Sequence, residues 1–311
     1  GTTPSKSTRL FGREAILFMD TDFGTLSFGR TGALSAGTGS YNLAKYTPFS
    51  TGWGSLTAKK ANFWIGDRDR MDNTVTYRTP SFAGFQVTAQ YSFNRAGQEE
   101  AGNERLNERY AALGASYNNG PLSTALVLDT VMPDHYHYTA PTETDPYKKE
   151  QRDIDDSFGV TFGASYDFEV VKTFFQAQYA QHESKLGTAT ASVNKKEGMT
   201  GYAFSLGATA PVLGGTAYAQ ANYLSAEADK TAGDVKDEQQ NWGVALGYTY
   251  SFSKRTMAYT YASYNELKDK DSGDKEKDTE GNPRSARFGG FQYRLVVCRS
   301  LDVLYTAAEP Q

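Results

Sequence analysis

Apolar and polar residues alternate along nearly the whole chain, in segments of about nine to twelve residues. The stretch from Phe158 to Tyr166 is typical, with apolar residues at the even positions and polar or small residues at the odd positions. Successive side chains of a β-strand point to opposite faces, so this period predicts strands with one apolar face. The segments are long enough for a tilted strand to cross the hydrocarbon layer of a membrane, and about twice as long as an ordinary strand.

Aromatic residues gather at the ends of the apolar faces. Tyr91 and Phe93 end one segment, and Tyr166 and Phe168 end another. Alternation alone also fits a soluble β-sandwich, in which aromatic residues would be buried centrally. Their place at the strand ends favours the interfacial girdles of a membrane barrel. A helical membrane protein is excluded, because no apolar run approaches the ~18 residues that a membrane helix needs.

Short turns alternate with long polar connections. Four segments contain a glycine followed by similar residues, as in Leu113-Gly114-Ala115 and Phe162-Gly163-Ala164, and each leads through a short turn into another strand. This is the hairpin plan of outer-membrane barrels, which have tight turns on one side and long loops on the other. The long connections are 95–107, 132–155, 183–198, 227–240 and 268–286.

The pattern predicts about thirteen antiparallel strands. Bacterial single-chain barrels have even strand numbers, so we expect an odd number of strands, three, to precede the first segment. The predicted segments are 9–19, 24–29, 73–79, 85–94, 109–118, 122–130, 157–167, 172–182, 201–210, 216–225, 241–251, 256–267 and 287–295.

Two stretches resemble the general porins of Gram-negative outer membranes, which are sixteen-stranded trimers. Residues 13–18 with 23–30 resemble the family's fourth and fifth strands, and the more specific stretch 70–85 resembles its sixth and seventh. The resemblance implies an all-β transmembrane barrel over residues 1–295, incomplete at its N-terminus. Residues 296–311 form an atypical tail, because the family normally ends its last strand on a C-terminal Phe.

The same resemblance implies that the segment 31–69 folds into the barrel and narrows its channel. It is rich in glycine, serine and aromatic residues, and a connection of this length usually has a function. The alternative is an ordinary external loop. Facing charges at a constriction create a transverse field that selects ions. The candidates are the basic residues Arg13, Arg30, Arg70, Lys59 and Lys60 and the acidic residues Asp67, Asp69 and Asp72.

These charges have a simpler interpretation as ordinary strand-end or interfacial groups. The direction in which Arg13 faces stays open, because both parities around it are apolar. If the basic groups dominate the narrowing, a modest anion preference is expected despite the net charge of −4. The acidic excess lies in outer loops, farther away than the ~8 Å screening length.

No catalytic or metal-binding set emerges from the sequence. His135 and His137 lack a nearby third ligand, so solvated loop histidines are favoured. The acidic run 269–280 has glycine at the fifth position of a calcium loop instead of the sixth. We therefore expect no enzyme, no cofactor and no metal, and the charge balance gives no reason for a nucleic-acid partner.

The resemblance implies a passive diffusion channel for ions and small hydrophilic solutes in the outer membrane of a Gram-negative bacterium. Its expected partners are outer-membrane lipid, lipopolysaccharide and two further copies of the chain in a homotrimer. Two alternatives stay open: a substrate-specific outer-membrane channel, and a β-barrel surface adhesin or outer-membrane enzyme.

Overall fold

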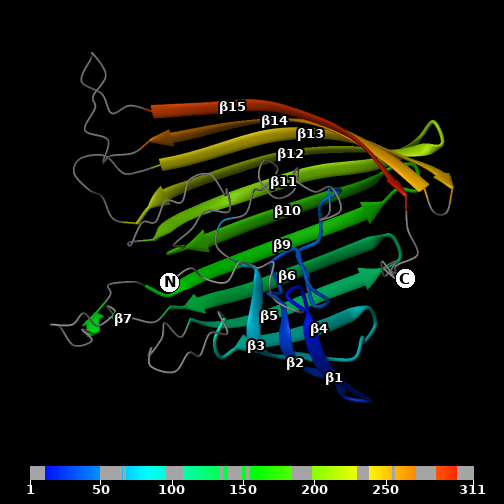
Figure 1. Ribbon diagram of the computed structural model, residues 1–311. Coiled ribbons are helices and arrows are strands. Elements are labelled where there is room, and N and C mark those ends of the chain that lie inside the picture. The colour runs from blue at the N-terminus through cyan, green and yellow to red at the C-terminus, as the bar shows by residue number, and fades with distance from the viewer. Residues whose placement is uncertain are drawn as a thin grey trace, which may run out of the picture.

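Among the residues that the structure describes, thirteen strands form one antiparallel sheet in which every strand pairs with its neighbours in chain order (Figure 1). The computed structural model describes residues 11–49, 65, 68–95, 108–133, 136–138, 149–151, 155–183, 198–229, 238–253, 256–270 and 285–299. The strands of the sheet are β1 (Ala15–Thr21), β2 (Gly24–Gly32), β3 (Arg70–Arg78), β4 (Phe85–Ser92), β5 (Arg109–Asn119), β6 (Leu122–Met132), β9 (Ser157–Asp167), β10 (Lys172–Gln181), β11 (Met199–Val212), β12 (Gly215–Ala228), β13 (Glu238–Ser253), β14 (Thr256–Lys270) and β15 (Ser285–Arg299).

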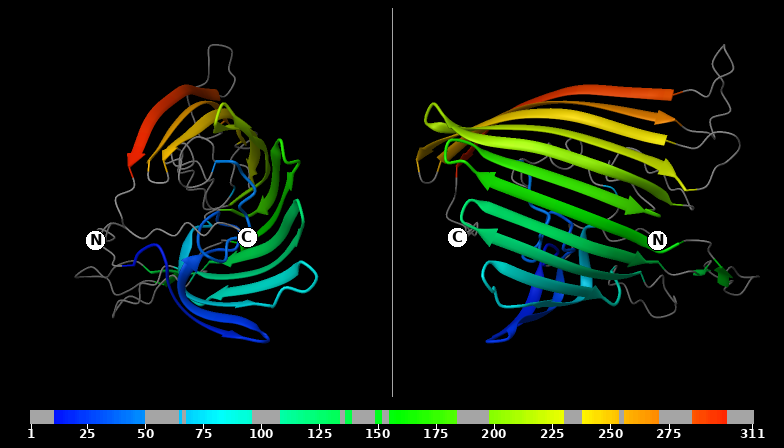
Figure 2. Two further views of the ribbon diagram at one scale, coloured as in Figure 1. Left: turned by 90° about the vertical axis from the view of Figure 1, so that its right-hand side faces the viewer. Right: turned by 180° about the vertical axis from the view of Figure 1, so that it is seen from behind.

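The sheet curves around an interior, and β1 and β15 stand at the two ends of the strand order (Figure 2). Tight turns join consecutive strands at one end of the sheet. One of them runs through Gly120, whose φ of 55° lies in the left-handed region that glycine adopts without strain. The strand ends that flank the long connections, such as the end of β4 and the start of β5, lie at the opposite end of the sheet (Figure 1). Among the described residues, no helix has the length and apolarity needed to cross a bilayer.

The outer face of the sheet is apolar and its inner face is polar, which is the reverse of a soluble protein. On β11 the side chains of Phe204 and Leu206 point outward and are exposed, whereas Ser205 between them is buried in the interior. Outward aromatic pairs lie near the turn end of the sheet, where the rings of Tyr166 and Phe168 are 4.5 Å apart. Others lie nearer the loop end, such as Trp242 and Tyr264 at 5.4 Å. An apolar outer band between aromatic girdles is the surface of a membrane barrel.

The predicted antiparallel all-β sheet is confirmed, and its differences from the prediction are confined to the strand ends. β1 begins at Ala15 instead of residue 9, and β15 continues to Arg299 instead of ending at Leu295. A separate small hairpin, β7 (Tyr136–Tyr138) with β8 (Lys149–Gln151), lies within the connection 132–155. Backbone pairing extends beyond the apolar band, so side-chain alternation does not mark where a strand stops.

Candidate pore constriction

The segment that follows β2 packs against the concave face of the sheet. Near its start, the side-chain amide of Gln90 on β4 donates to the carbonyl of Gly32 at 3.2 Å. Farther along, the hydroxyl of Thr47 donates to the side-chain oxygen of Gln220 on β12 at 2.7 Å. Phe49 then packs with Ala245 on β13 and with β14. The described part of this segment therefore crosses the interior from one side of the sheet to the other (Figures 1 and 2).

Glycines on the wall make room for this segment. A Cβ at Gly114 on β5 would clash with the side chain of Leu43, and one at Gly163 on β9 would clash with the ring of Tyr46. A Cβ at Gly207 on β11 would likewise clash with Pro48. The wall lacks side chains where the segment lies closest to it.

Arg68 fixes the returning end of the segment through a buried network of charges. Its guanidinium donates to Oδ1 of Asp129 on β6, at 2.8 Å from Nη2 and 3.1 Å from Nε. It also pairs with the carboxylate of Glu183, which lies just beyond β10. The other oxygen of Asp129 accepts hydrogen bonds from Ser35 and from Tyr110, the latter at 3.3 Å. Asp129 on β6 thus joins Ser35 near the start of the segment to Arg68 near its end, and Arg68 also reaches Glu183 just beyond β10.

Burial and charge act in opposite directions on this network. Burial lowers the pKa of Arg68, but the carboxylates of Asp129 and Glu183 outweigh it and raise that pKa. Burial also raises the pKa of Glu183, to about 6, because the opposing charge of Arg68 only partly offsets the loss of solvent. Arg68 therefore stays charged, whereas Glu183 titrates near pH 6.

The stability of the protein should depend on pH through Glu183. Its pKa is higher in the folded state than the ordinary value of 4.5. Protonated Glu183 therefore stabilises the folded state by about 2 kcal/mol. This stabilisation is fully present below pH 4.5 and is lost as pH rises through about 6. Urea unfolding between pH 4 and pH 7 measures this change. Glu183→Gln should flatten this part of the profile, and an unchanged profile in that variant would contradict the assignment.

Two further ion pairs lie nearby. Nη1 of Arg30 on β2 is 2.9 Å from the carboxylate of Asp72 on β3, and Nε of Arg30 donates to the carbonyl of Gly12. Arg70, at the start of β3, lies 3.9 Å from Asp69, and both side chains are partly exposed. Arg30 and Asp72 are therefore compensated in the interior, whereas Arg70 and Asp69 remain open to solvent.

Glu14 links the start of β1 to the same segment. Its carboxylate accepts hydrogen bonds from the backbone N–H of Ser40 at 2.9 Å and from the Ser40 hydroxyl at 2.7 Å. It also accepts one from the hydroxyl of Thr31. Burial raises the pKa of Glu14. These hydrogen bonds and the charge of Arg70 lower it by more, so the pKa ends below its ordinary value. Glu14 is thus a charged anchor of the segment.

The family model described as Gram-negative porin matches residues 2–272. The chain belongs to the Gram-negative porin family. The predicted resemblance and the predicted outer-membrane location are therefore confirmed.

An outer membrane porin protein of Bordetella pertussis is 30% identical to this porin over 282 residues, which are 82% of this chain and 67% of the relative. Outer membrane porin protein 32 of Delftia acidovorans is 29% identical over 268 residues, covering 84% of this chain and 65% of the relative. The chain thus spans about two thirds of the length of these curated relatives.

Solved barrels share the fold at low sequence identity. The anion-selective porin from Comamonas acidovorans has a TM-score of 0.55 and 24% identity, over 94% of this chain and 80% of its own. Outer-membrane expressed OmpT of Vibrio cholerae has a TM-score of 0.56 and 17% identity, over 91% of this chain and 81% of its own.

The structure brings some of the predicted site residues of the porin together. Arg30, Arg70, Asp69 and Asp72 lie along β2, β3 and the adjoining end of the segment. Arg13 is exposed just before β1. The other candidates, Lys59, Lys60 and Asp67, lie outside the described residues.

Sequence reasoning missed several charged groups of this porin. Asp129 and Glu183 bind Arg68, Lys45 is exposed on the segment, and Arg78 lies 4.5 Å from the centre of the Tyr41 ring. Asp129 carried a signal, because it is a carboxylate at an interior position of a predicted strand. Glu183 and Lys45 lie in connections between strands, where no alternation indicates which way a side chain points.

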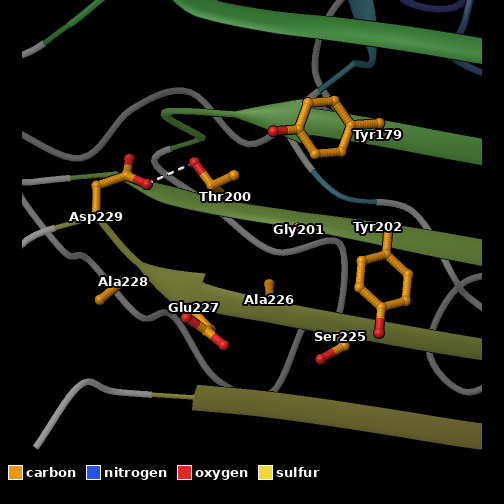
Figure 3. Close-up of a pocket in the computed structure, with 9 residues that line it drawn as sticks. All are labelled: Tyr179, Thr200, Gly201, Tyr202, Ser225, Ala226, Glu227, Ala228 and Asp229. Carbon is orange, nitrogen blue, oxygen red and sulfur yellow. Dashed lines mark hydrogen bonds between the residues drawn. The ribbon is translucent and has the colours of Figure 1, made fainter.

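A pocket of about 300 Å³ lies on β10, β11 and β12 and contains Thr200, Tyr202, Glu227 and Asp229 (Figure 3). Asp229 accepts a hydrogen bond from Thr200 at 2.5 Å and lies 2.9 Å from Nδ1 of His182. Tyr202 belongs to the outward face of β11, so this pocket is not part of the interior site.

Within the described residues no group of three or more His, Cys, Asp or Glu could hold a metal. His135 and the side chain of His137 lie outside them.

Proposed function

We propose that this porin forms a passive diffusion channel for ions and small hydrophilic solutes, with the segment 31–69 as its constriction. The observation that carries the proposal is the packing of Gly32–Phe49 along the concave face, where it takes up space inside the barrel. The interior wall is polar, as a wet channel requires. The proposal needs no chemical conversion and no cofactor.

The exposed apolar band supports contact with outer-membrane lipid and lipopolysaccharide. Outward residues such as Leu206 and Leu246 are more than half exposed, which water would disfavour and lipid would not. A homotrimer is part of the proposal. In its support, in-vitro folded OmpT of Vibrio cholerae, with a TM-score of 0.52, is named as a trimer form.

The selectivity that we propose is a modest preference for anions. The pair of Arg30 and Asp72 is compensated within the protein, and the network of Arg68 sets one cation against two carboxylates whose side chains are at most 4% exposed. The cations Arg13 and Lys45 are exposed, and Arg70 is partly exposed beside Asp69. Lys59, Lys60 and Asp67 remain proposed members of the same filter. The Comamonas structure is named an anion-selective porin, which supports the same sign.

The full-length protein in planar bilayers should conduct, with a reversal potential under a salt gradient that shows anion preference. Arg70→Ala should shift this potential toward the cation side. A unit charge about 8 Å away in water lowers the energy of an anion and raises that of a cation by about 0.5 kcal/mol each, so the anion-to-cation ratio should fall by up to about fivefold, and less at high salt.

Arg109→Ala is the matched control, because it removes the same charge from an exposed position on the outward parity of β5. Its reversal potential should equal that of the unmodified protein. Absence of conductance from correctly folded protein would refute the channel. A cation-selective protein, or equal potentials for the two variants, would remove Arg70 from the filter.

A further inference from the structure

The pocket of about 300 Å³ across β10, β11 and β12 opens on the outer surface of the sheet (Figure 3). Tyr179 lies directly opposite Tyr202, and Thr200 lies directly opposite Glu227. The side chains of Tyr179, Tyr202 and Glu227 are exposed. The pocket is therefore open to whatever surrounds the barrel, and a ligand can reach it without entering the channel.

The pocket lies in the aromatic girdle at the loop end of the sheet. The ring of Tyr202 is 5.5 Å from that of Phe204 and 6.2 Å from that of Tyr223. Aromatic girdles lie at the level of the lipid headgroups, and the long loops of outer-membrane barrels lie outside the cell. The pocket therefore faces the headgroups of the outer leaflet.

Polarity changes in steps along the outward face of β12. Ala221 and Tyr223 are followed by Ser225 and Glu227, and Asp229 lies just beyond the strand. Outward neighbours on one strand are two residues apart, so each step is about 7 Å. The two tyrosines of the lining lie at one end of the pocket and Asp229 lies at the other (Figure 3). An amphiphile with its tail beside Tyr223 would thus place its headgroup between Ser225 and Glu227.

The charges of the pocket determine which headgroup fits. Its described lining contains two carboxylates and no basic side chain. The carboxylate of Asp229 accepts a hydrogen bond from Thr200 and lies 2.9 Å from Nδ1 of His182, whereas Glu227 is exposed. These carboxylates repel an anionic headgroup, and a carboxylate only accepts hydrogen bonds, so the headgroup must donate them. The faces of tyrosine rings also attract cations.

We propose that this pocket binds the ammonium headgroup of a cationic amphiphile in the outer leaflet. Glu227 supplies the opposite charge, and the headgroup lies against the ring of Tyr202. The hydrocarbon tail follows the apolar band past Phe204 and Tyr223. The site is on the outside of the barrel, so its occupancy does not depend on conduction.

Dodecylamine is the test probe, and dodecanol, with the same tail and an uncharged headgroup, is its comparison. Methyl NMR of the full-length protein in micelles of an uncharged detergent measures binding at Thr200, which lines the pocket. The Thr200 methyl signal should shift saturably with dodecylamine, at a concentration several-fold below that needed for dodecanol. The methyl signal of Thr216, near the turn end of β12, should stay in place.

Glu227→Gln should raise the half-saturating concentration of dodecylamine about two- to fivefold, because it removes one exposed ion pair. Tyr202→Leu keeps an apolar side chain but removes the ring, and it should have an effect of similar size.

Glu169→Gln is the matched control, because it removes the same charge from an exposed position at the turn end of the sheet. Its half-saturating concentration should equal that of the unmodified protein. The proposed site would be overturned by equal half-saturation for dodecylamine and dodecanol, or by equal effects of Glu227→Gln and Glu169→Gln. Shifts at Thr216 as large as those at Thr200 would show general insertion into the micelle instead of a site.

Discussion

Arg68→Met is expected to lower the free energy of unfolding by about 3–5 kcal/mol, because it leaves two buried carboxylates without their cation. The side chains of Arg68 and Glu183 are each 4% exposed, and that of Asp129 is 2% exposed. Two charges freed in this way repel one another and cannot be hydrated where they lie. Urea unfolding of the protein in lipid vesicles measures the loss.

Arg109→Met is the matched control, since Arg109 is exposed on β5 and its loss should change stability by less than about 0.5 kcal/mol. Adding Asp129→Asn and Glu183→Gln to Arg68→Met should recover much of the loss, because removing all members of a buried ionic network costs far less than breaking it. Equal stability of Arg68→Met and Arg109→Met would mean that the network does not anchor the segment.

Leu206→Arg should destabilise the folded barrel in lipid by about 2–4 kcal/mol. Leu206 points outward from the middle of β11 and is 62% exposed on the apolar band. A guanidinium there would lie in hydrocarbon, near the midplane of the bilayer. The measurement is the free energy of unfolding from vesicles, at a pH where folding is reversible.

Leu213→Arg makes the same change in the tight turn between β11 and β12, where Leu213 is 90% exposed. A charge at the interface costs only about 0–1 kcal/mol, so this variant should stay close to the unmodified protein. Losses of similar size in the two variants would show that β11 does not present Leu206 to the hydrocarbon.

The sheet could be predicted because its determinants are local. The alternation of Tyr202, Phe204 and Leu206 with small residues assigns the outward face of β11 without knowledge of any other strand. The alternation also places Ser205 inside. It does not reveal that Ser205 is nearly inaccessible there, because burial in the interior depends on groups that belong to other parts of the chain.

The charged site was predicted only in part because its contacts are distant in sequence. Arg30 and Asp72 lie in stretches that resemble the porin family, so the resemblance identified them. Arg68 instead finds Asp129 and Glu183 at separations of 61 and 115 residues. No pattern in one sequence indicates which carboxylates will meet which guanidinium. Lys45 was missed for a related reason, since its exposure follows from how the segment packs on the wall.

The path of Gly32–Phe49 across the sheet also has a consequence for the order of assembly. The segment follows β2, yet Thr47 bonds to a residue 173 positions later and Ser35 to one 94 positions later. Contacts of such separation form slowly, because the intervening chain must first be ordered. Tyr41 packs with Val127 on β6 and Tyr46 lies against Gly163 on β9, but Phe49 packs with Ala245 on β13 and Tyr261 on β14. The packing of the segment is therefore incomplete until β13 and β14 are in place. Docking of this segment marks a nearly finished barrel, and until then its aromatic residues are exposed apolar surface of the kind that makes folding intermediates aggregate.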